Sequence, residues 1–300
     1  MKISVVTPSF NQGAYLEATL RSLLAQNYPD LELIVIDGGS TDQSVEIIRR
    51  YAAPISYWES EKDRGQSHAL NKGFAHVHGD IWSWLNSDDL LEPGVLQRVA
   101  DVFAENPEAG VVYGDCVYVG EDGETIIEKF PGEPYSRLRH LAHRFIAQPS
   151  CFFRTSMVPP TVREDLHFCM DYDLWLQLSA RGVKFHYVPE FFSRYRLHDQ
   201  SKSVGALLAM HAEIVEKIYR PILRRGASRE ERHAIAEAAG DMIHQLNSLG
   251  ARGPVLQTLL FRLFETRVLP SAALLSLGLQ AILGPGLVRR IQRWKGQARA

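Results

Sequence analysis

Apolar residues in the first part of the chain form short β-branched runs that alternate with segments of helical period. Runs at 3–7, 31–36, 55–59 and 81–85 predict strands, and the intervening segments, such as the leucines of 16–24, place apolar residues every three or four positions. Strands that alternate with helices predict βαβ units and a mostly parallel sheet. The pattern therefore indicates an α/β fold.

The pattern changes twice further along the chain. Segments 110–118 and 124–130 predict an antiparallel strand pair turned at Glu121–Gly123, so the sheet is expected to be mixed. From residue 206 onward no strand pattern occurs, and the segments have helical period. We therefore expect two regions, an α/β domain over 1–204 and a helical C-terminal region over 205–300.

Composition limits the classes of protein to which the chain can belong. The 300 residues are 45% hydrophobic and 23% charged, which excludes a disordered or collagen-like chain and suits about two domains. The formal charge of -2 gives no basic field, so a nucleic-acid partner is not expected. The chain starts without a secretory signal pattern, which favours a cytoplasmic location.

The three cysteines, Cys116, Cys151 and Cys169, lack the C-x-x-C spacing of a thiolate metal site. Their odd number argues against a disulfide framework and suits a reducing compartment. We expect them to be small core residues.

Polar residues gather where each of the first four predicted strands ends, at 7–11, 37–42, 63–66 and 86–89. Taken singly, each cluster is typical of a turn or a helix cap. In an open parallel sheet, however, ligands bind at the carboxyl ends of the strands. The four clusters together therefore predict one binding site at this edge.

These clusters resemble the motifs of the family 2 glycosyltransferases. The motifs are VVTPSFN at 5–11, VIDGGSTD at 35–42, GQSHALNKG at 65–73 and NSDD at 86–89, and the resemblance covers residues 1–204. It implies the GT-A fold, a Rossmann-like, mostly parallel mixed sheet flanked by helices. It also implies a nucleotide-sugar half over about 1–90 and an acceptor half over about 91–204.

The resemblance implies a donor site for a nucleotide-diphosphosugar, most often a UDP-sugar. Asp37 would accept the N3 hydrogen of uracil, because an ionised carboxylate is acceptor-only. Arg64 would neutralise the diphosphate, since guanidinium is always cationic. The other donor residues implied are Thr7, Pro8 and Asn11 at the base and ribose. Asn86 would touch the ribose, Asp88 would hold the metal, and Asp89 would be an orienting or sugar-contacting neighbour.

The resemblance also implies a divalent cation, Mn²⁺ or Mg²⁺, on the leaving diphosphate. NSDD occupies the place of the family's Asp-x-Asp motif, so Asp88 is the expected metal ligand, and His198 is a second candidate. The alternative for a single histidine is a structural hydrogen bond. Hard cations prefer carboxylate and phosphate oxygens, which suits this site.

Segment 168–175 resembles the family's Glu-Asp-x-Asp-Leu-Trp stretch, with Met170 in place of the glutamate. By that resemblance Asp171 is the general base, and Asp173 is either a second site carboxylate or a helix N-terminal partner. The mechanism implied is a single displacement with inversion, in which Asp171 deprotonates the acceptor hydroxyl.

The last fifty residues differ in charge from the rest. Residues 251–300 hold eight basic side chains and one acid, Glu265, a charge of +7 that leaves -9 for 1–250. The uncharged stretch between Arg267 and Arg289 is interrupted by glycine and proline, so helices lying on an anionic membrane are favoured over a span. A helical cap packed on protein is the alternative. The location expected is then the inner face of the cytoplasmic membrane.

Two other functions compete with transfer. A nucleotide-sugar pyrophosphorylase shares the fold class, but 8–13 lacks the basic residues of its usual loop. A noncatalytic nucleotide-sugar-binding module would not need Asp88 and Asp171, and both are present. We therefore expect an inverting hexosyltransferase of cell-envelope polysaccharide or glycolipid synthesis, whose acceptor is a saccharide or a lipid-linked group.

Overall fold

The computed structural model describes residues 1–198 and 206–283. The chain divides into two compact units, one formed by 1–135 with 145–205 and the other by 136–144 with 206–300. The predicted boundary at residue 204 lies outside the described residues. Segment 136–144 groups with the C-terminal helices, whereas the sequence pattern assigned it to the α/β region. The exact limits of the two predicted regions stay a prediction.

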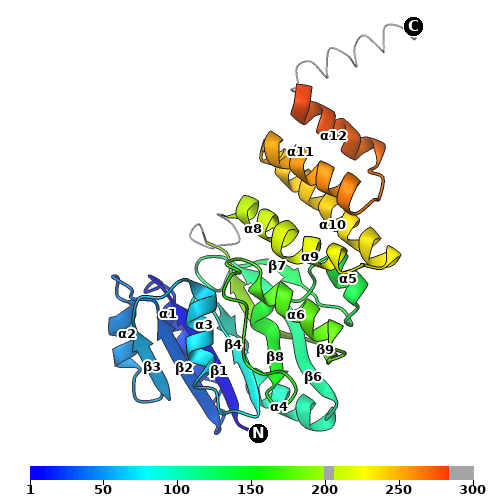
Figure 1. Cartoon of the computed structure of the whole chain (residues 1–300). Helices are drawn as coiled ribbons and strands as arrows, with labels where there is room; N and C mark the ends of the chain where they lie inside the picture. The colour runs from blue at the N-terminus through cyan, green and yellow to red at the C-terminus, as the bar shows by residue number, and fades with distance from the viewer. Residues whose placement is uncertain (199–205, 284–300) are drawn as a thin grey trace, which may run out of the picture. The chain divides into compact units, whose positions relative to one another are not determined.

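The first unit is built on a nine-stranded sheet with the strand order β3-β2-β1-β4-β8-β6-β9-β5, and β7 pairs with β6 (Figure 1). Its strands are β1 (Ile3–Ser9), β2 (Leu31–Asp37), β3 (Tyr57–Ser60), β4 (Ile81–Trp84), β5 (Leu90–Leu91), β6 (Ala109–Val119), β7 (Ile126–Phe130), β8 (Cys151–Arg154) and β9 (Lys184–Arg196). Strands β1 to β4 are parallel to one another where they pair, while β8 is antiparallel to both β4 and β6. The predicted mixed, mostly parallel sheet is confirmed.

Helices cover both faces of this sheet, because most strand residues are apolar on both sides. The helices are α1 (Leu16–Leu24), α2 (Ser44–Arg50), α3 (Gln66–Phe74), α4 (Val95–Glu105), η1 (Gln148–Ser150) and α6 (Met170–Ala180). Helices α1, α2 and α4 share one core with Val5 and Val35. Helix α3 packs on the opposite face, where a Cβ added to Gly73 would lie 2.5 Å from the Val6 side chain.

Two short strands were not apparent from the sequence. β8 and β5 have four and two residues, too few for a period to be distinguished from a buried loop. The expected antiparallel pair is confirmed as β6 and β7. Strand β9 extends to Arg196, because it pairs with the whole length of β6.

The second unit consists of helices joined by short loops over its described residues. Its helices are α5 (Arg137–Ala142), α8 (Leu207–Ile214), η2 (Val215–Tyr219), α9 (Arg220–Arg224), α10 (Arg229–Ser248), α11 (Arg252–Leu260), η3 (Phe261–Glu265) and α12 (Ala272–Leu283). The Ser228 hydroxyl accepts a hydrogen bond from the Glu231 N–H and the Glu231 carboxylate accepts one from the Ser228 N–H, each at 3.1 Å. This capping box sets the start of α10.

The cysteines are core residues, as predicted. Cys116, Cys151 and Cys169 are free thiols and are buried. Burial raises the pKa of Cys116 to about 12 and that of Cys151 further still. Such thiols stay protonated near neutral pH and are not nucleophiles.

Candidate functional site

The loops that follow β1 and β2 are joined by hydrogen bonds at the carboxyl edge of the sheet. The Asn11 side-chain carbonyl accepts a hydrogen bond from the Thr41 N–H at 2.9 Å, and the Ser40 hydroxyl accepts one from the Asn11 N–H at 2.7 Å. Asn11 has a φ of 52°, the left-handed region that asparagine tolerates. Asn11 therefore fixes the two loops against each other, and its side-chain carbonyl is turned to Thr41.

Asp37 ends β2 and is fully buried. One oxygen, Oδ2, accepts hydrogen bonds from the Gly39 N–H at 3.1 Å, the Ser40 N–H at 2.9 Å and the Ser60 hydroxyl at 2.7 Å. The other oxygen, Oδ1, accepts one from the Ser40 hydroxyl. Two carboxylate oxygens offer about four acceptor sites, so this loop uses the capacity of Asp37. The contact with uracil that the sequence predicts for Asp37 stays a prediction.

The residues before and after this turn differ in exposure. Thr7 and Pro8, predicted at the base and ribose, are buried, and the Thr7 hydroxyl has no hydrogen-bond partner among the described residues. Phe10 is 58% exposed and lies over Gly38, where an added Cβ would be 3.3 Å from its ring. The exposed Phe10 ring, at the edge of the sheet where a ligand is expected, offers a stacking surface. The sequence analysis did not identify Phe10 as a site residue.

Arg64 precedes α3, as predicted, but has a partner from the loop before α6. Its Nη2 lies 2.6 Å from Oε2 of Glu164, and the two side chains are 70% and 40% exposed. Exposed ion pairs contribute about 0–1 kcal/mol, so this one leaves the guanidinium able to exchange Glu164 for a phosphate. Glu164 was not among the predicted residues, because one hundred positions separate the pair.

Asn86 follows β4 and is the hub of an amide network. Its Oδ1 accepts a hydrogen bond from Gln66 Nε2 at 2.7 Å, and its Nδ2 donates to Gln148 Oε1 at 3.2 Å. Gln148 also donates to the Trp84 carbonyl at 2.8 Å. An ionised aspartate at position 86 could not donate a hydrogen bond to Gln148. The asparagine in the motif therefore suits the hydrogen-bonding groups around it.

Asp88 and His198 meet, as the predicted metal site requires. His198 Nε2 lies 3.1 Å from Asp88 Oδ2, and the two side chains are 1% and 20% exposed. The described residues hold no group of three or more His, Cys, Asp or Glu side chains arranged for a metal. A carboxylate and an imidazole suit Mn²⁺ or Mg²⁺ when phosphate oxygens and water complete the shell, so the donor set fits an open site.

Asp89 is buried next to this pair. Burial raises the pKa of Asp89 well above its ordinary value, and the charge of Asp88 raises it further. Asp89 Oδ1 accepts a hydrogen bond from the Arg196 N–H at 3.1 Å, and the Asp88 carbonyl accepts one from Arg196 Nε at 2.8 Å. Asp89 and Arg196 therefore hold the motif in place, and a contact of Asp89 with the sugar stays a prediction.

Asp171 lies in the first turn of α6 and is half-buried. Its Oδ1 accepts a hydrogen bond from the Tyr172 N–H at 2.7 Å. Its charge contributes to the raised pKa of Cys151, after burial, which places it near the start of β8. Asp173 is buried and lies 3.1 Å from Arg163 Nη1, so it has a structural ion pair.

The loop before α6 is tied to the start of α3. The Ser67 hydroxyl donates to the Leu166 carbonyl, and a Cβ added to Gly65 would lie 3.6 Å from His167 Nδ1. These contacts bring the start of α6 to the side of the sheet where Arg64 lies. The sequence placed these segments in separate halves and gave no signal for the contact.

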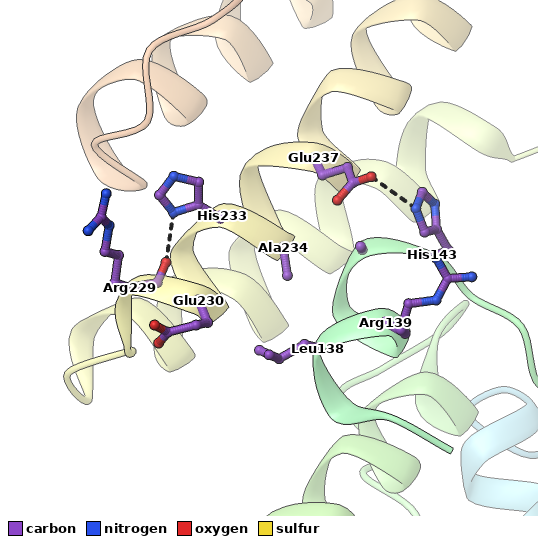
Figure 2. A pocket seen from close by; sticks show the side chains of 9 residues that line it. Leu138, Arg139, His143, Arg229, Glu230, His233, Ala234 and Glu237 are labelled. Carbon is purple, nitrogen blue, oxygen red and sulfur yellow. Dashed lines mark hydrogen bonds and ion pairs between the residues drawn. The ribbon is translucent and has the colours of Figure 1, made fainter. Parts of the chain in front are cut away.

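A separate cavity of about 480 Å³ lies within the second unit, between α5 and the start of α10 (Figure 2). Figure 2 shows Glu237 turned toward His143, whose Nε2 is 3.1 Å from Glu237 Oε1. His233 Nδ1 is 2.9 Å from the Arg229 carbonyl. None of the predicted site residues lines this cavity.

The chain is similar in sequence to known glycosyltransferases. The family described as Glycosyl transferase family 2 matches residues 4–159. An uncharacterised glycosyltransferase of Nostoc sp. is 35% identical over 125 residues, which are 41% of this chain and 39% of the relative. The chain therefore spans well under half the length of that relative.

Two solved structures have the same fold at low sequence identity. S. aureus TarS 1–349 in complex with UDP-GlcNAc matches with a TM-score of 0.61 and 16% identity, over 95% of this chain and 92% of that one. The Pyrobaculum calidifontis mannosyltransferase PcManGT, in complex with GDP-Man and Mn²⁺, matches with a TM-score of 0.56 and 18% identity, over 94% and 87%. The family match covers more than half of the chain, and its residues include the four polar loops of the sheet edge. The chain therefore belongs to glycosyltransferase family 2 and has a GT-A fold.

Proposed function

We propose that this protein is an inverting glycosyltransferase that moves a hexose from a UDP-sugar to a hydroxyl of a saccharide or lipid-linked acceptor. The observation that carries the proposal is the Asp88–His198 pair at the carboxyl edge of β4, next to the amide network of Asn86. Family membership and the two nucleotide-sugar complexes of the same fold support it. A pathway of cell-envelope polysaccharide or glycolipid synthesis agrees with such an acceptor.

The donor would lie across the ends of β1, β2 and β4. Phe10 offers its exposed ring to the base, and Asn86 Oδ1, which accepts one hydrogen bond from Gln66, has a second lone pair for a ribose hydroxyl. Arg64 would exchange its exposed partner Glu164 for the diphosphate, because a guanidinium binds phosphate oxygens in a forked geometry. Asp171 would accept the proton of the acceptor hydroxyl as the hydroxyl oxygen attacks the anomeric carbon.

Asp88 and His198 would hold a divalent cation, Mn²⁺ or Mg²⁺. When bound, such an ion stabilises the negative charge on a leaving diphosphate. Asp89 and Arg196 keep the Asp88 loop fixed through its backbone. This rigid support leaves the Asp88 carboxylate to the ion.

A thermal-shift panel of nucleotide-sugars with and without Mn²⁺ tests the donor proposal. We expect a UDP-sugar to raise the melting temperature only when Mn²⁺ is present, because the cation would hold the diphosphate. A ligand at 100 times its Kd stabilises the folded protein by about 2.7 kcal/mol, which is enough to be measured. Nucleotide-free sugars are the control and should have no effect. Absence of stabilisation by every nucleotide-sugar would contradict the proposal.

We also propose that the helical unit contacts an anionic membrane surface through α11 and η3. Leu260 and Phe264 are 44% and 67% exposed, and with the half-buried Leu256 and Leu263 they form one helical face. The neighbouring face of the helix already packs through Val255 and Leu259. No helix among residues 1–198 and 206–283 is long and apolar enough to cross a bilayer.

Charge favours a lipid surface as the partner of this face. Over 251–300 the basic side chains are Arg252, Arg262, Arg267, Arg289, Arg290, Arg293, Lys295 and Arg299, against one acid. Apolar side chains rimmed by arginine are typical of helices that lie on anionic bilayers. The positions from 284 onward lie outside the described residues, so only their charge enters the proposal.

Replacing Leu260 and Phe264 together by aspartate is expected to lower binding to vesicles that contain an anionic lipid by at least about 10-fold, since burying each side chain contributes about 1.5–3 kcal/mol. Cosedimentation with anionic and neutral vesicles measures this loss. Ile126→Asp is the matched control, because Ile126 is 59% exposed on β7. Equal binding by the double variant and the control would exclude the membrane contact.

A further inference from the structure

A nucleotide-sugar site needs a group that distinguishes one base from another. Stacking on Phe10 cannot do so, because every base has a π-face. A carboxylate can, since it accepts a hydrogen bond from the ring N–H of uracil or guanine, which cytosine and adenine lack. Such a carboxylate must lie near Phe10 and must have a free acceptor.

Asp37 does not meet this requirement. It is fully buried, and four hydrogen bonds from its own loop and from Ser60 use both of its oxygens. Freeing one oxygen would leave a buried N–H or hydroxyl without a partner, which costs about 1–3 kcal/mol. Asp37 is thus a positioning residue for the turn of 38–40.

Asp63 does meet it. A Cβ added to Gly38 would lie 2.6 Å from Asp63 Oδ2 and 3.3 Å from the Phe10 ring. The Asp63 carboxylate therefore occupies the space that a side chain at position 38 would take, beside the exposed ring. Its Oδ1 accepts a hydrogen bond from the Gly65 N–H at 2.7 Å, which fixes the side chain. Its Oδ2 accepts no hydrogen bond from the residues that the structure describes, and the side chain is half-buried.

We propose that Asp63 selects the donor nucleotide by accepting a hydrogen bond from the ring N–H of its base while Phe10 stacks on the base. The inference rests on the proposed nucleotide-sugar function. The absence of a side chain at Gly38 is required for this base recognition, because any side chain there would displace the Asp63 carboxylate. This recognition selects UDP- or GDP-sugars over CDP- and ADP-sugars.

Asp63→Asn is the direct test, read by calorimetric titration of UDP and of UDP methylated at N3. Methylation removes the ring N–H, so wild-type protein should bind the methylated nucleotide about 10- to 100-fold more weakly, the range for a hydrogen bond to a charged group. In the variant, the amide oxygen still accepts the Gly65 N–H, and the amide nitrogen takes the place of the free carboxylate oxygen. The variant should therefore bind both nucleotides weakly and within about threefold of each other, because its amide no longer distinguishes them.

Gly38→Ala is a second test that leaves the carboxylate in the chain. Gly38 has no positive φ, so alanine is tolerated by the backbone, while its Cβ would move Asp63. We expect the same loss of discrimination. Glu61→Gln is the matched control, since it removes a charge two positions from Asp63 on a side chain that is 74% exposed. It should discriminate as wild type does.

The outcomes separate the two proposals. Wild-type protein that binds neither UDP nor GDP, with or without Mn²⁺, would overturn the nucleotide-sugar function and this inference with it. If wild-type protein binds UDP and the Asp63→Asn variant discriminates against the methylated form as strongly as wild type does, only the inference is overturned. If GDP is the nucleotide bound, the same comparison is made with GDP methylated at N1, and the same two results decide.

Discussion

Asp171→Asn is expected to lower kcat for sugar transfer by about 100- to 10,000-fold, the usual contribution of a general base. Asparagine has nearly the shape of aspartate but cannot take a proton from the acceptor hydroxyl. The Asp171 Oδ1 atom accepts the Tyr172 N–H at 2.7 Å, and the oxygen of an asparagine can do the same, so the start of α6 should be kept. Steady-state kinetics with saturating donor measure the loss, and the Kd for UDP-sugar should change less than about threefold.

Asp173→Asn is the matched control for that experiment. Asp173 lies two positions further along α6, is buried and pairs with Arg163. Arg163 pairs with Asp173, and the Gln177 amide donates a hydrogen bond to it, so loss of the Asp173 charge should alter the melting temperature. The control should keep kcat within a few-fold of wild type. If Asp171→Asn instead abolishes donor binding, or if Asp173→Asn is the inactive variant, Asp171 is not the base.

Local patterns were sufficient for much of the fold. Strands β1, β2 and β4 are runs of buried apolar residues, and the intervening helices have clear apolar periodicity, so each element follows from its own residues. The Ser228–Glu231 capping box at the start of α10 is likewise formed by residues close together in the sequence. Elements of two to four residues, such as β5 and β8, have no period of their own and depend on the strands beside them.

The site residues were found more readily than their partners. The family resemblance identified Asp88 and His198, and the structure brings them together. The partners of Arg64 and Asn86 come from segments far along the chain, Glu164 and Gln148, and no local pattern encodes such pairs. The same holds for Asp37, because two of the four hydrogen bonds that occupy it come from backbone N–H groups, which every sequence has, and a third comes from the distant Ser60 hydroxyl. The sequence therefore indicates which residues have reactive or ligand-binding side chains. Only the folded structure shows which of their atoms already have hydrogen-bond partners.

Asp88→Asn is expected to remove metal-dependent transfer. The amide keeps the size of the side chain but loses the charge that a hard cation requires, so activity with Mn²⁺ should fall at least about 100-fold, consistent with the several kcal/mol that a bound metal supplies. The fold should survive, because Arg196 contacts the Asp88 backbone carbonyl and because the variant removes a like charge beside buried Asp89.

The measurement that checks this pairs a kinetic assay with thermal shift. Donor with Mn²⁺ should raise the melting temperature of wild-type protein and not that of Asp88→Asn, while the ligand-free melting temperatures should agree. Asp101→Asn, on the exposed side of α4, is the control and should behave as wild type. Full activity of wild-type protein after chelation, or of Asp88→Asn with Mn²⁺, would rule out a metal at Asp88 and His198 and leave Arg64 as the cation that faces the leaving diphosphate.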